Sequence, residues 1–278
     1  MNARLLFILL LFTIGALWYI IGYWRRKAGE AAFAAARLTE KSEERERYCR
    51  LAVMAGHREA CRMLCLLHPE RFDGHSPHKP FKLRGIRISF YGYYYPSRYN
   101  ALLNDEQRAF CHSIYQFKQG DIHGIEFFKT CMNALQLKKR PYHIMFMPCS
   151  NWIKYGQRFK RLDWYIGKHR QDLTSGLYDV DICDARESLH EAKGGEKRIL
   201  ERNYLITGKI KGKEIIIIDD VLTTGQSVVD YKEEIERCGG KVVAAIFYGK
   251  TLSMPSMLLV QIHVWGNHIA HIIERMTK

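Results

Sequence analysis

The second half of the chain alternates between short apolar runs and longer stretches with apolar residues at helical spacing. Continuous apolar runs cover Tyr142 to Met147, Ile215 to Ile218 and Val242 to Tyr248, and such runs are typical of strands buried on both faces of a parallel sheet. Between them, Arg158 to Arg170 and Val228 to Cys238 have the periodicity of amphipathic helices. Strands that alternate with helices predict an α/β domain with a mainly parallel sheet flanked by helices.

The flanking patterns extend this domain to residues 80–278. Ile86 to Tyr95 (IRISFYGYYY) predicts a strand or hairpin, and Asn104 to Gln119 and Gly124 to Leu137 predict amphipathic helices. A short strand over Leu258 to Trp265 is expected to close one edge of the sheet. The aromatic residues of IRISFYGYYY could stack nucleobases, but an edge of the sheet that covers the core is the commoner explanation.

Residues 28–79 predict a helical spacer and a linker. The sequence from Gly29 to about His68 has high helix propensity and is interrupted at Gly56. The stretch RYCRLAVMAGHREACRMLCLL resembles one helix–turn–helix unit of the SEL repeat family, although two ordinary helices explain the same pattern. Phe72 to Pro80 contains glycine, serine and proline and predicts a linker.

The N-terminal residues 1–27 predict a transmembrane anchor. Leu5 to Trp24 contains no charged residue, and twenty helical residues span the roughly 30 Å hydrocarbon core of a bilayer. A cleaved signal peptide would have a shorter apolar core, and a buried core helix would have a polar face. Positive charges follow at once, at Arg25, Arg26 and Lys27. The sequence thus predicts a single-pass membrane protein, with lipid as a partner and the α/β domain in the cytoplasm.

Charge and cysteine usage narrow the choice of partners. The 278-residue chain has 43 Lys and Arg against 29 Asp and Glu, a formal charge of +14, which favours phosphorylated substrates, anionic lipids or nucleic acid. Its eight cysteines form no C-x-x-C pair, and unpaired cysteines suit a reducing compartment. His57, Cys61 and Cys65 could ligate a metal from one helix face, but apolar packing explains them better.

The segment from Glu214 to Thr251 carries the candidate chemistry. It reads as strand, loop, helix and strand, so its loop lies at the carboxyl end of a parallel strand, where open α/β sheets bind ligands. Asp219 and Asp220 can accept hydrogen bonds from two vicinal hydroxyls. Thr223 to Ser227 (Thr223, Thr224, Gly225, Gln226 and Ser227) offers hydroxyls and backbone N–H groups to a phosphate at a helix N-terminus.

This arrangement resembles the 5-phosphoribosyl-1-pyrophosphate (PRPP) binding motif of type I phosphoribosyltransferases. That motif has four hydrophobic residues, two acidic residues, a short hydrophobic spacer and then T-T-G-x-S, and every defining position is present between Ile215 and Ser227. The resemblance implies that Asp219 and Asp220 bind the ribose and that Thr223 to Ser227 bind the 5′-phosphate. A strand–turn–helix capped by Asp and Thr is the alternative without a ligand.

Other segments resemble the ComF-like, competence-associated branch of this family. Lys118 matches a lysine on a helix before the first strand, and Cys149, Ser150 and Asn151 match a pyrophosphate loop. Gln157 to Arg161 loosely matches a basic R-x-F segment, but Arg158 and Arg161 are more simply explained as an exposed helix face. Unlike ComF proteins that begin with a four-cysteine zinc module, this chain begins with the predicted anchor.

A basic segment is also similar to the family's mobile loop. Its candidate residues, which could stabilise the leaving pyrophosphate or simply form a solvated loop, are Arg186, His190, Lys193, Arg198 and Arg202. The resemblance implies Mg²⁺ bound together with PRPP and held mainly through PRPP, with no direct protein ligand assigned.

Three functions follow as expectations. The first is a membrane-anchored phosphoribosyltransferase that transfers phosphoribose to a nucleobase or another nitrogen nucleophile, with release of pyrophosphate. The second is a non-catalytic, PRPP-binding accessory protein in DNA uptake or another membrane-proximal DNA process. The third, binding of single-stranded nucleic acid by the basic surface, has no recognised nucleic-acid fold to support it. The acceptor is not encoded in a legible pattern, although IRISFYGYYY or Val260 to His268 could form the variable hood that selects it.

Overall fold

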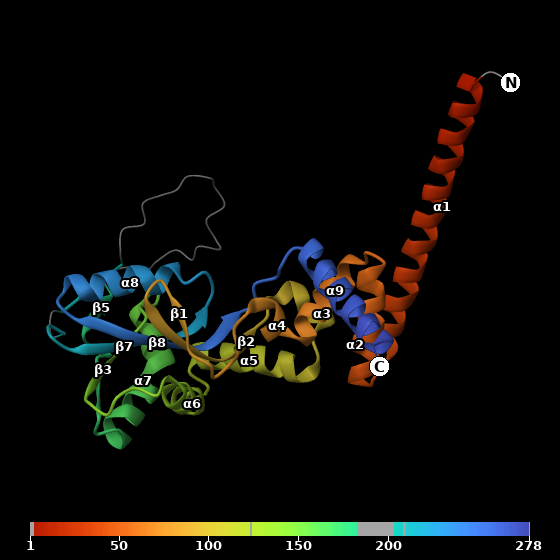
Figure 1. Cartoon of the computed structure of the whole chain (residues 1–278). Helices are drawn as coiled ribbons and strands as arrows, with labels where there is room; N and C mark the ends of the chain where they lie inside the picture. The colour runs from red at the N-terminus through yellow and green to blue at the C-terminus, as the bar shows by residue number, and fades with distance from the viewer. Residues whose placement is uncertain (1–2, 123, 183–202, 208–209, 278) are drawn as a thin grey trace. The chain divides into compact units, whose positions relative to one another are not determined.

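The chain divides into two compact units. A computed structural model describes residues 3–122, 124–182, 203–207 and 210–277. The helical unit comprises residues 1–74 and 253–278, and the α/β unit comprises residues 75–252 (Figure 1). The α/β unit is therefore inserted between two parts of the helical unit.

The helical unit is built around the contact between helix α1 (Ala3–Leu38) and helix α2 (Ser42–Met54). Small residues permit this contact, because a Cβ at Gly29 would lie 3.0 Å from Ala55 Cβ. Phe33 stacks on His57 with ring centroids 4.4 Å apart. Gly56 has a φ of +89°, which favours glycine, and the predicted interruption there is confirmed. The described helices of this unit are α1 (Ala3–Leu38), α2 (Ser42–Met54), α3 (Arg58–Leu67), α4 (Pro69–Asp73) and α9 (Met257–Met276).

The predicted division between an anchor and a spacer differs from the structure. Helix α1 runs without interruption past Arg25 to Leu38. Arg25 donates a hydrogen bond through Nε to the Ala55 carbonyl oxygen at 3.2 Å, and Ala36 is fully buried, so the second half of α1 packs as part of the helical unit. Among the residues that the structure describes, no helix meets the length and apolarity needed to cross a bilayer, and the span predicted for Leu5 to Trp24 is not found.

The predicted strand over Leu258 to Trp265 is wrong, because this segment lies in helix α9. Ser256 caps the helix by accepting a hydrogen bond from the Leu259 N–H at 3.4 Å. Val260 and Val264, one helical turn apart, are the buried residues of α9. The buried residues therefore follow a helical period rather than the alternation of a strand. As a result, residues 253–278 belong to the helical unit and not to the α/β domain.

The α/β unit contains a six-stranded sheet with the order β1-β2-β8-β7-β3-β4. All neighbouring strands are parallel except the β1–β2 hairpin, which confirms the mainly parallel sheet. A separate antiparallel pair is formed by β5 and β6. The strands are β1 (Phe81–Leu83), β2 (Ile86–Tyr94), β3 (Tyr142–Phe146), β4 (Leu173–Ser175), β5 (Val180–Ile182), β6 (Tyr204–Ile206), β7 (Glu214–Leu222) and β8 (Lys241–Thr251).

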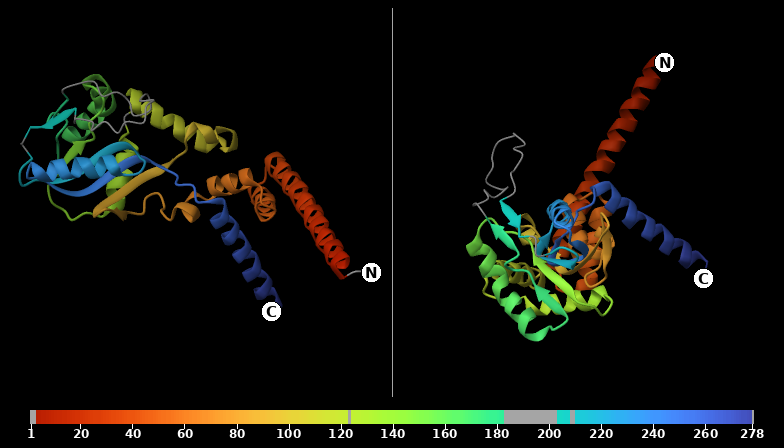
Figure 2. Two further views of the ribbon diagram at one scale, coloured as in Figure 1. Left: turned by 90° about the horizontal axis from the view of Figure 1, so that it is seen from above. Right: turned by 90° about the vertical axis from the view of Figure 1, so that its left-hand side faces the viewer.

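Helices cover both faces of this sheet. The connections from β2 to β3 and from β3 to β4 run in one direction along the sheet, and the connection from β7 to β8 through α8 runs in the other. Because crossovers between parallel strands are right-handed, α8 lies on the opposite face from the helices that precede β3 and β4. Helix α8 lies along one face, with α6 and α7 on the other (Figure 1 and Figure 2). The helical segments are η1 (Ser97–Leu102), α5 (Asp105–Gln119), α6 (Ile125–Leu135), α7 (Trp152–His169) and α8 (Gln226–Arg237).

The topology creates a ligand-binding position between β3 and β7. Strand β3 connects onward to β4 on one side, while β7 connects to β8 on the other. Such a reversal opens a crevice outside the carboxyl ends of the two strands. Residues Ile215 to Ile218 of β7 are fully buried, so the core fixes the position of this strand. The candidate residues that follow β3 and β7 are therefore brought to one edge.

Candidate functional site

Two adjacent carboxylates lie at the carboxyl end of β7. The side chains of Asp219 and Asp220 are 13% and 10% exposed. The Asp220 N–H donates to Asp219 Oδ1 at 2.8 Å, which fixes one carboxylate over the backbone of the other. Because two buried like charges repel, the site requires cations or hydrogen-bond donors nearby.

Two cations from separate helices meet this acidic pair. Arg158 Nη1 in α7 lies 2.7 Å from Asp220 Oδ2 and 3.8 Å from Asp219 Oδ1. Lys118 Nζ in α5 lies 3.5 Å from Asp220 Oδ2, so the lysine indicated by the ComF resemblance is adjacent to the acidic pair.

The assignment of Arg158 to an exposed helix face is wrong. Its side chain is only 16% exposed. Burial lowers the pKa of Arg158, but the neighbouring carboxylates, Asp220 above all, outweigh burial and raise it overall. Helix α7 begins at Trp152, before the predicted start at Arg158, and it points this side chain toward the end of β7. Arg158 is therefore part of the candidate site.

The two carboxylates do not share one electrostatic environment. Burial, and after it the Asp220 carboxylate, raises the pKa of Asp219 to about 7, against the lowering effect of Arg158. The shorter Arg158 contact goes to Asp220. Because the pKa of Asp219 lies near neutral pH, its carboxyl group can gain or lose a proton at small cost in free energy when a further donor or cation binds.

The predicted phosphate cradle forms the loop between β7 and α8. Thr223, Thr224, Gln226 and Ser227 are exposed, whereas Gly225 is buried. The φ of Gly225 is +78°, and a Cβ there would collide with the Leu83 side chain. Glycine is therefore required both for the turn and for the approach of the β1–β2 hairpin.

The groups of this cradle face solvent at the N-terminus of α8. Thr224 Oγ1 accepts a long hydrogen bond of 3.4 Å from the Gln226 N–H. A helix of this length presents unpaired N–H groups and a partial positive charge at its first turn. The cradle can thus bind an anionic group.

The predicted pyrophosphate loop follows β3 at the same edge of the sheet. The Met147 N–H donates to the Ile218 carbonyl oxygen at 2.9 Å, which places the residues after Met147 beside the acidic pair. Asn151 caps α7 by accepting a hydrogen bond from the Lys154 N–H at 2.9 Å. Ser150, between Cys149 and Asn151, is half-buried.

Cys149 takes part in this loop through its backbone. Asn203 Nδ2 donates to the Cys149 carbonyl oxygen at 3.2 Å, and both residues are buried. Burial raises the pKa of the Cys149 thiol to about 12, so the thiol stays protonated at neutral pH. These contacts indicate a positioning role for the loop rather than a nucleophilic cysteine.

Two tyrosines, Tyr94 at the end of β2 and Tyr115 in α5, contact each other in the same unit as the acidic pair. Tyr94 and Tyr115 place their hydroxyl oxygens 3.0 Å apart. Burial raises the pKa of Tyr94, with further contributions from Tyr115 and from the Asp220 charge. Of the two predicted hood segments, IRISFYGYYY thus includes a residue near the site, while Val260 to His268 lies in α9 of the helical unit.

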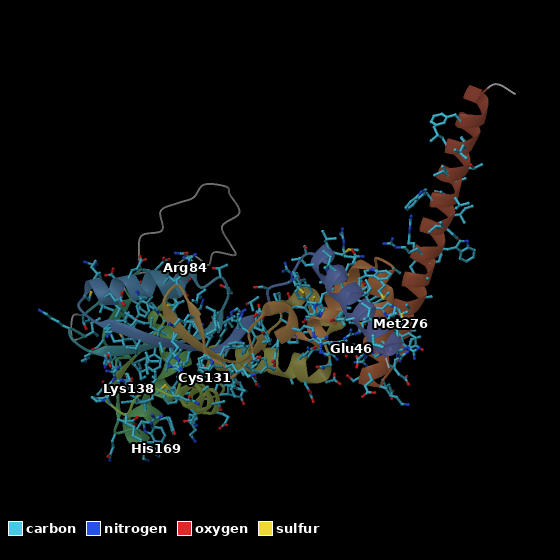
Figure 3. The ribbon with its side chains drawn as sticks, viewed as in Figure 1. Glu46, Arg84, Cys131, Lys138, His169 and Met276 are labelled. Carbon is cyan, nitrogen blue, oxygen red and sulfur yellow. The ribbon has the colours of Figure 1, made fainter. Side chains whose placement is uncertain are left out.

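Several predicted site residues cannot be placed. Those of the proposed mobile loop, Arg186, His190, Lys193, Arg198 and Arg202, lie outside the described residues. Sequence reasoning also missed Arg84, whose guanidinium donates to Gln226 Oε1 at 2.5 Å, because the hairpin that carries it is far from the motif along the chain (Figure 3).

The groups at this site that could bind a hard metal cation are the carboxylates of Asp219 and Asp220. Within the described part of the chain, no group of three or more His, Cys, Asp or Glu side chains is arranged to hold a metal. Asp219 and Asp220 supply oxygen donors of the kind that Mg²⁺ accepts, but they also contact Arg158. The residues therefore fit a magnesium ion that takes most of its ligands from a bound phosphate compound.

Comparison with known proteins agrees with this geometry. Residues 171–251 match the family described as phosphoribosyl transferase domain, and this stretch includes the acidic pair and the cradle. Orotate phosphoribosyltransferase from Sulfolobus acidocaldarius is 42% identical over 57 residues, which are 20% of this chain. The alignment spans 26% of that relative, about a quarter of its length. The family match thus covers the part of the chain that contains the acidic pair and the cradle.

Proposed function

We propose that the α/β unit binds PRPP with Mg²⁺ and transfers phosphoribose to a nitrogen nucleophile, with release of pyrophosphate. The observation that carries this proposal is the acidic pair and the glycine-containing cradle, separated by Val221 and Leu222 at the switch point of the sheet. A diol-binding group and a phosphate-binding group at this spacing suit the two ends of a ribose 5-phosphate. The match of residues 171–251 supports the same ligand class.

Each part of the ligand has a candidate binding group. Asp219 and Asp220 would accept hydrogen bonds from the ribose hydroxyls, and Thr223 to Ser227 would bind the 5′-phosphate. The loop of Cys149, Ser150 and Asn151 would bind the pyrophosphate, since it follows β3 beside the acidic pair. Arg158 and Lys118 would then stand between ribose and pyrophosphate, because both contact Asp220.

The chemistry requires positive charge near the leaving group. During displacement at C1 the ribose becomes more positive and the departing pyrophosphate more negative. Arg158 and Lys118 would stabilise the pyrophosphate, while the carboxylates would stabilise the ribose. Bound Mg²⁺ would supply further positive charge to the pyrophosphate oxygens. Arg186 and Arg202, to which the family resemblance gives the same role, would add to this charge.

The proposed acceptor is a nitrogen nucleophile such as a nucleobase. The relative from Sulfolobus acidocaldarius is an orotate phosphoribosyltransferase, so orotate belongs in the panel of acceptors to be tested. The Asp220 charge contributes to the raised pKa of Tyr94, and Tyr94 and Tyr115 are the proposed contacts of a planar base. We place the acceptor on this side of C1.

The test combines binding with turnover. The full chain should bind PRPP in calorimetry with Mg²⁺ present, and Asp219→Asn and Asp220→Asn should abolish that binding. Release of pyrophosphate is then measured with orotate, the other common nucleobases and ammonia. Unchanged PRPP affinity in both variants would overturn the assignment. Binding without pyrophosphate release for any acceptor would instead favour the non-catalytic, ComF-like accessory role.

We also propose a location at the membrane, with the α/β unit in the cytoplasm. Support comes from α1, in which Phe12, Trp18 and Trp24 are 79%, 73% and 66% exposed, followed by Arg25 and Arg26. Exposed aromatic and apolar residues next to positive charges suit the lipid interface. Fractionation of cells at neutral pH and low salt tests this location, and recovery of the whole chain in the soluble fraction would refute it.

A further inference from the structure

The tip of the β1–β2 hairpin packs onto the phosphate cradle. Arg84 and Gly85 join the two strands with φ values of +46° and +83°. Positive φ at both central residues is the geometry of a tight hairpin turn whose twist matches the strands. The residue before the turn, Leu83, occupies the space that a side chain at Gly225 would need. The hairpin therefore approaches the cradle at a defined point.

This packing places the guanidinium of Arg84 at the start of α8. Arg84 Nη1 donates to Gln226 Oε1 at 2.5 Å, and Gln226 Nε2 donates to Asp230 Oδ1 at 2.6 Å. The amide of Gln226 is thus oriented by Asp230 with its oxygen toward Arg84. Gln226 is itself one of the cradle residues, and Arg84 is exposed, so the guanidinium borders an open anion-binding loop.

The position is electrostatically unusual for an arginine. The N-terminus of a helix carries a partial positive charge, so a cation is disfavoured there and an anion is favoured. Asp230, the acidic group one turn along α8, contacts Gln226 rather than Arg84 in the described hydrogen bonds. A bound phosphate would convert this unfavourable charge placement into a favourable one, since guanidinium and phosphate form paired hydrogen bonds.

We propose that Arg84 is a ligand of the 5′-phosphate, supplied by the hairpin and added to the cradle of Thr223 to Ser227. This inference rests on the proposed function, because it takes the cradle as the 5′-phosphate site. Arg84 lies outside residues 171–251, so the matched family segment does not contain it. The hairpin would make the site selective for ligands that carry a terminal phosphate on the ribose.

The experiment separates the two ends of the ligand. Calorimetry on the full chain uses ribose 5-phosphate as one probe and magnesium pyrophosphate as the other. Arg84→Gln should weaken binding of ribose 5-phosphate about tenfold and leave pyrophosphate binding unchanged, because one charge-assisted contact is lost at one end only. Arg84→Lys should restore part of the affinity, since it keeps the charge and loses the paired geometry.

Lys82→Gln is the matched control. Lys82 is exposed on the same hairpin, and its replacement removes the same charge without touching Gln226. Equal weakening in Lys82→Gln and Arg84→Gln would refute the inference and indicate a general charge effect. Equal weakening of both probes in Arg84→Gln would refute it as well, by indicating a structural role. Unchanged ribose 5-phosphate binding in Arg84→Gln overturns this inference alone, whereas absence of PRPP binding in the wild type overturns the proposed function.

Discussion

At the scale of single residues, the candidate site depends on how buried charges are paired. Arg158 shows why sequence alone could not assign it. Its neighbours Lys160 and Arg161 are exposed, and a run of basic residues on a helix ordinarily indicates a solvated face. Only the helix phase set by the cap at Asn151, and the packing of Phe159 in the core, directs Arg158 toward Asp220.

The raised pKa of Asp219 predicts that the stability of the ligand-free protein depends on pH. Its pKa of about 7 in the folded chain exceeds the value of about 3.9 for an unperturbed carboxyl. The folded chain therefore keeps this proton to higher pH than the unfolded chain does. As pH rises from about 4 to about 7, the free energy of unfolding should fall by up to about 4 kcal/mol through this group.

Chemical denaturation of the ligand-free protein across that pH range measures the effect. Other carboxyl groups and histidines titrate in the same window, so the informative quantity is the difference between wild type and Asp219→Asn. The variant should become more stable relative to wild type as pH rises. Parallel stability curves for the two proteins would show that Asp219 is not the titrating group.

At the scale of elements, the phosphate cradle (Thr223 to Ser227) lies between strand β7, helix α8 and the β1–β2 hairpin. Gly225→Ala should lower the free energy of unfolding by about 1–3 kcal/mol, because alanine is strained at positive φ and its methyl group meets Leu83. It should also weaken ribose 5-phosphate binding, since the cradle and the hairpin tip must move apart. Thermal unfolding and calorimetry measure the two effects.

A second glycine in the same unit provides the comparison. A Cβ at Gly156, inside α7, would meet no atom within 4 Å. Gly156→Ala should therefore stabilise the protein by about 0.5–1 kcal/mol through helix propensity, with ligand binding unchanged. If both substitutions destabilise to the same extent, the constraint at Gly225 is not specific to the turn.

The elements that sequence predicted well are those whose burial leaves a simple pattern. Strands β3, β7 and β8 are buried on both faces and appear as continuous apolar runs. The segment from Leu258 to Trp265 was wrongly predicted as a strand. Exposed apolar residues lie next to the buried Val260 and Val264, so the sequence does not reveal the helical period. The contact of Arg84 with Gln226 left no local signal, because 142 positions separate the two residues.

At the scale of the whole molecule, the described residues of the candidate site all belong to the α/β unit. Its described residues, from Arg84 to Ser227, lie within residues 75–252. A fragment of residues 75–252 should therefore unfold cooperatively and bind ribose 5-phosphate with an affinity near that of the full chain. A fragment that ends at residue 240 lacks β8, a central strand, and should not fold. Loss of binding in the longer fragment would show that the helical unit contributes to the site.

The insertion of one unit within the other has a consequence for synthesis. A ribosome releases the N-terminal domain of a chain first, and domains fold as units. Here the α/β unit is complete when Leu252 has emerged, while the helical unit still lacks α9. The bond from the Ser253 N–H to Asp73 Oδ1, 3.2 Å long, joins residues that are made 180 positions apart. The helical unit is thus the last to be completed, and a chain truncated after Leu252 would carry a complete α/β unit and an incomplete helical unit.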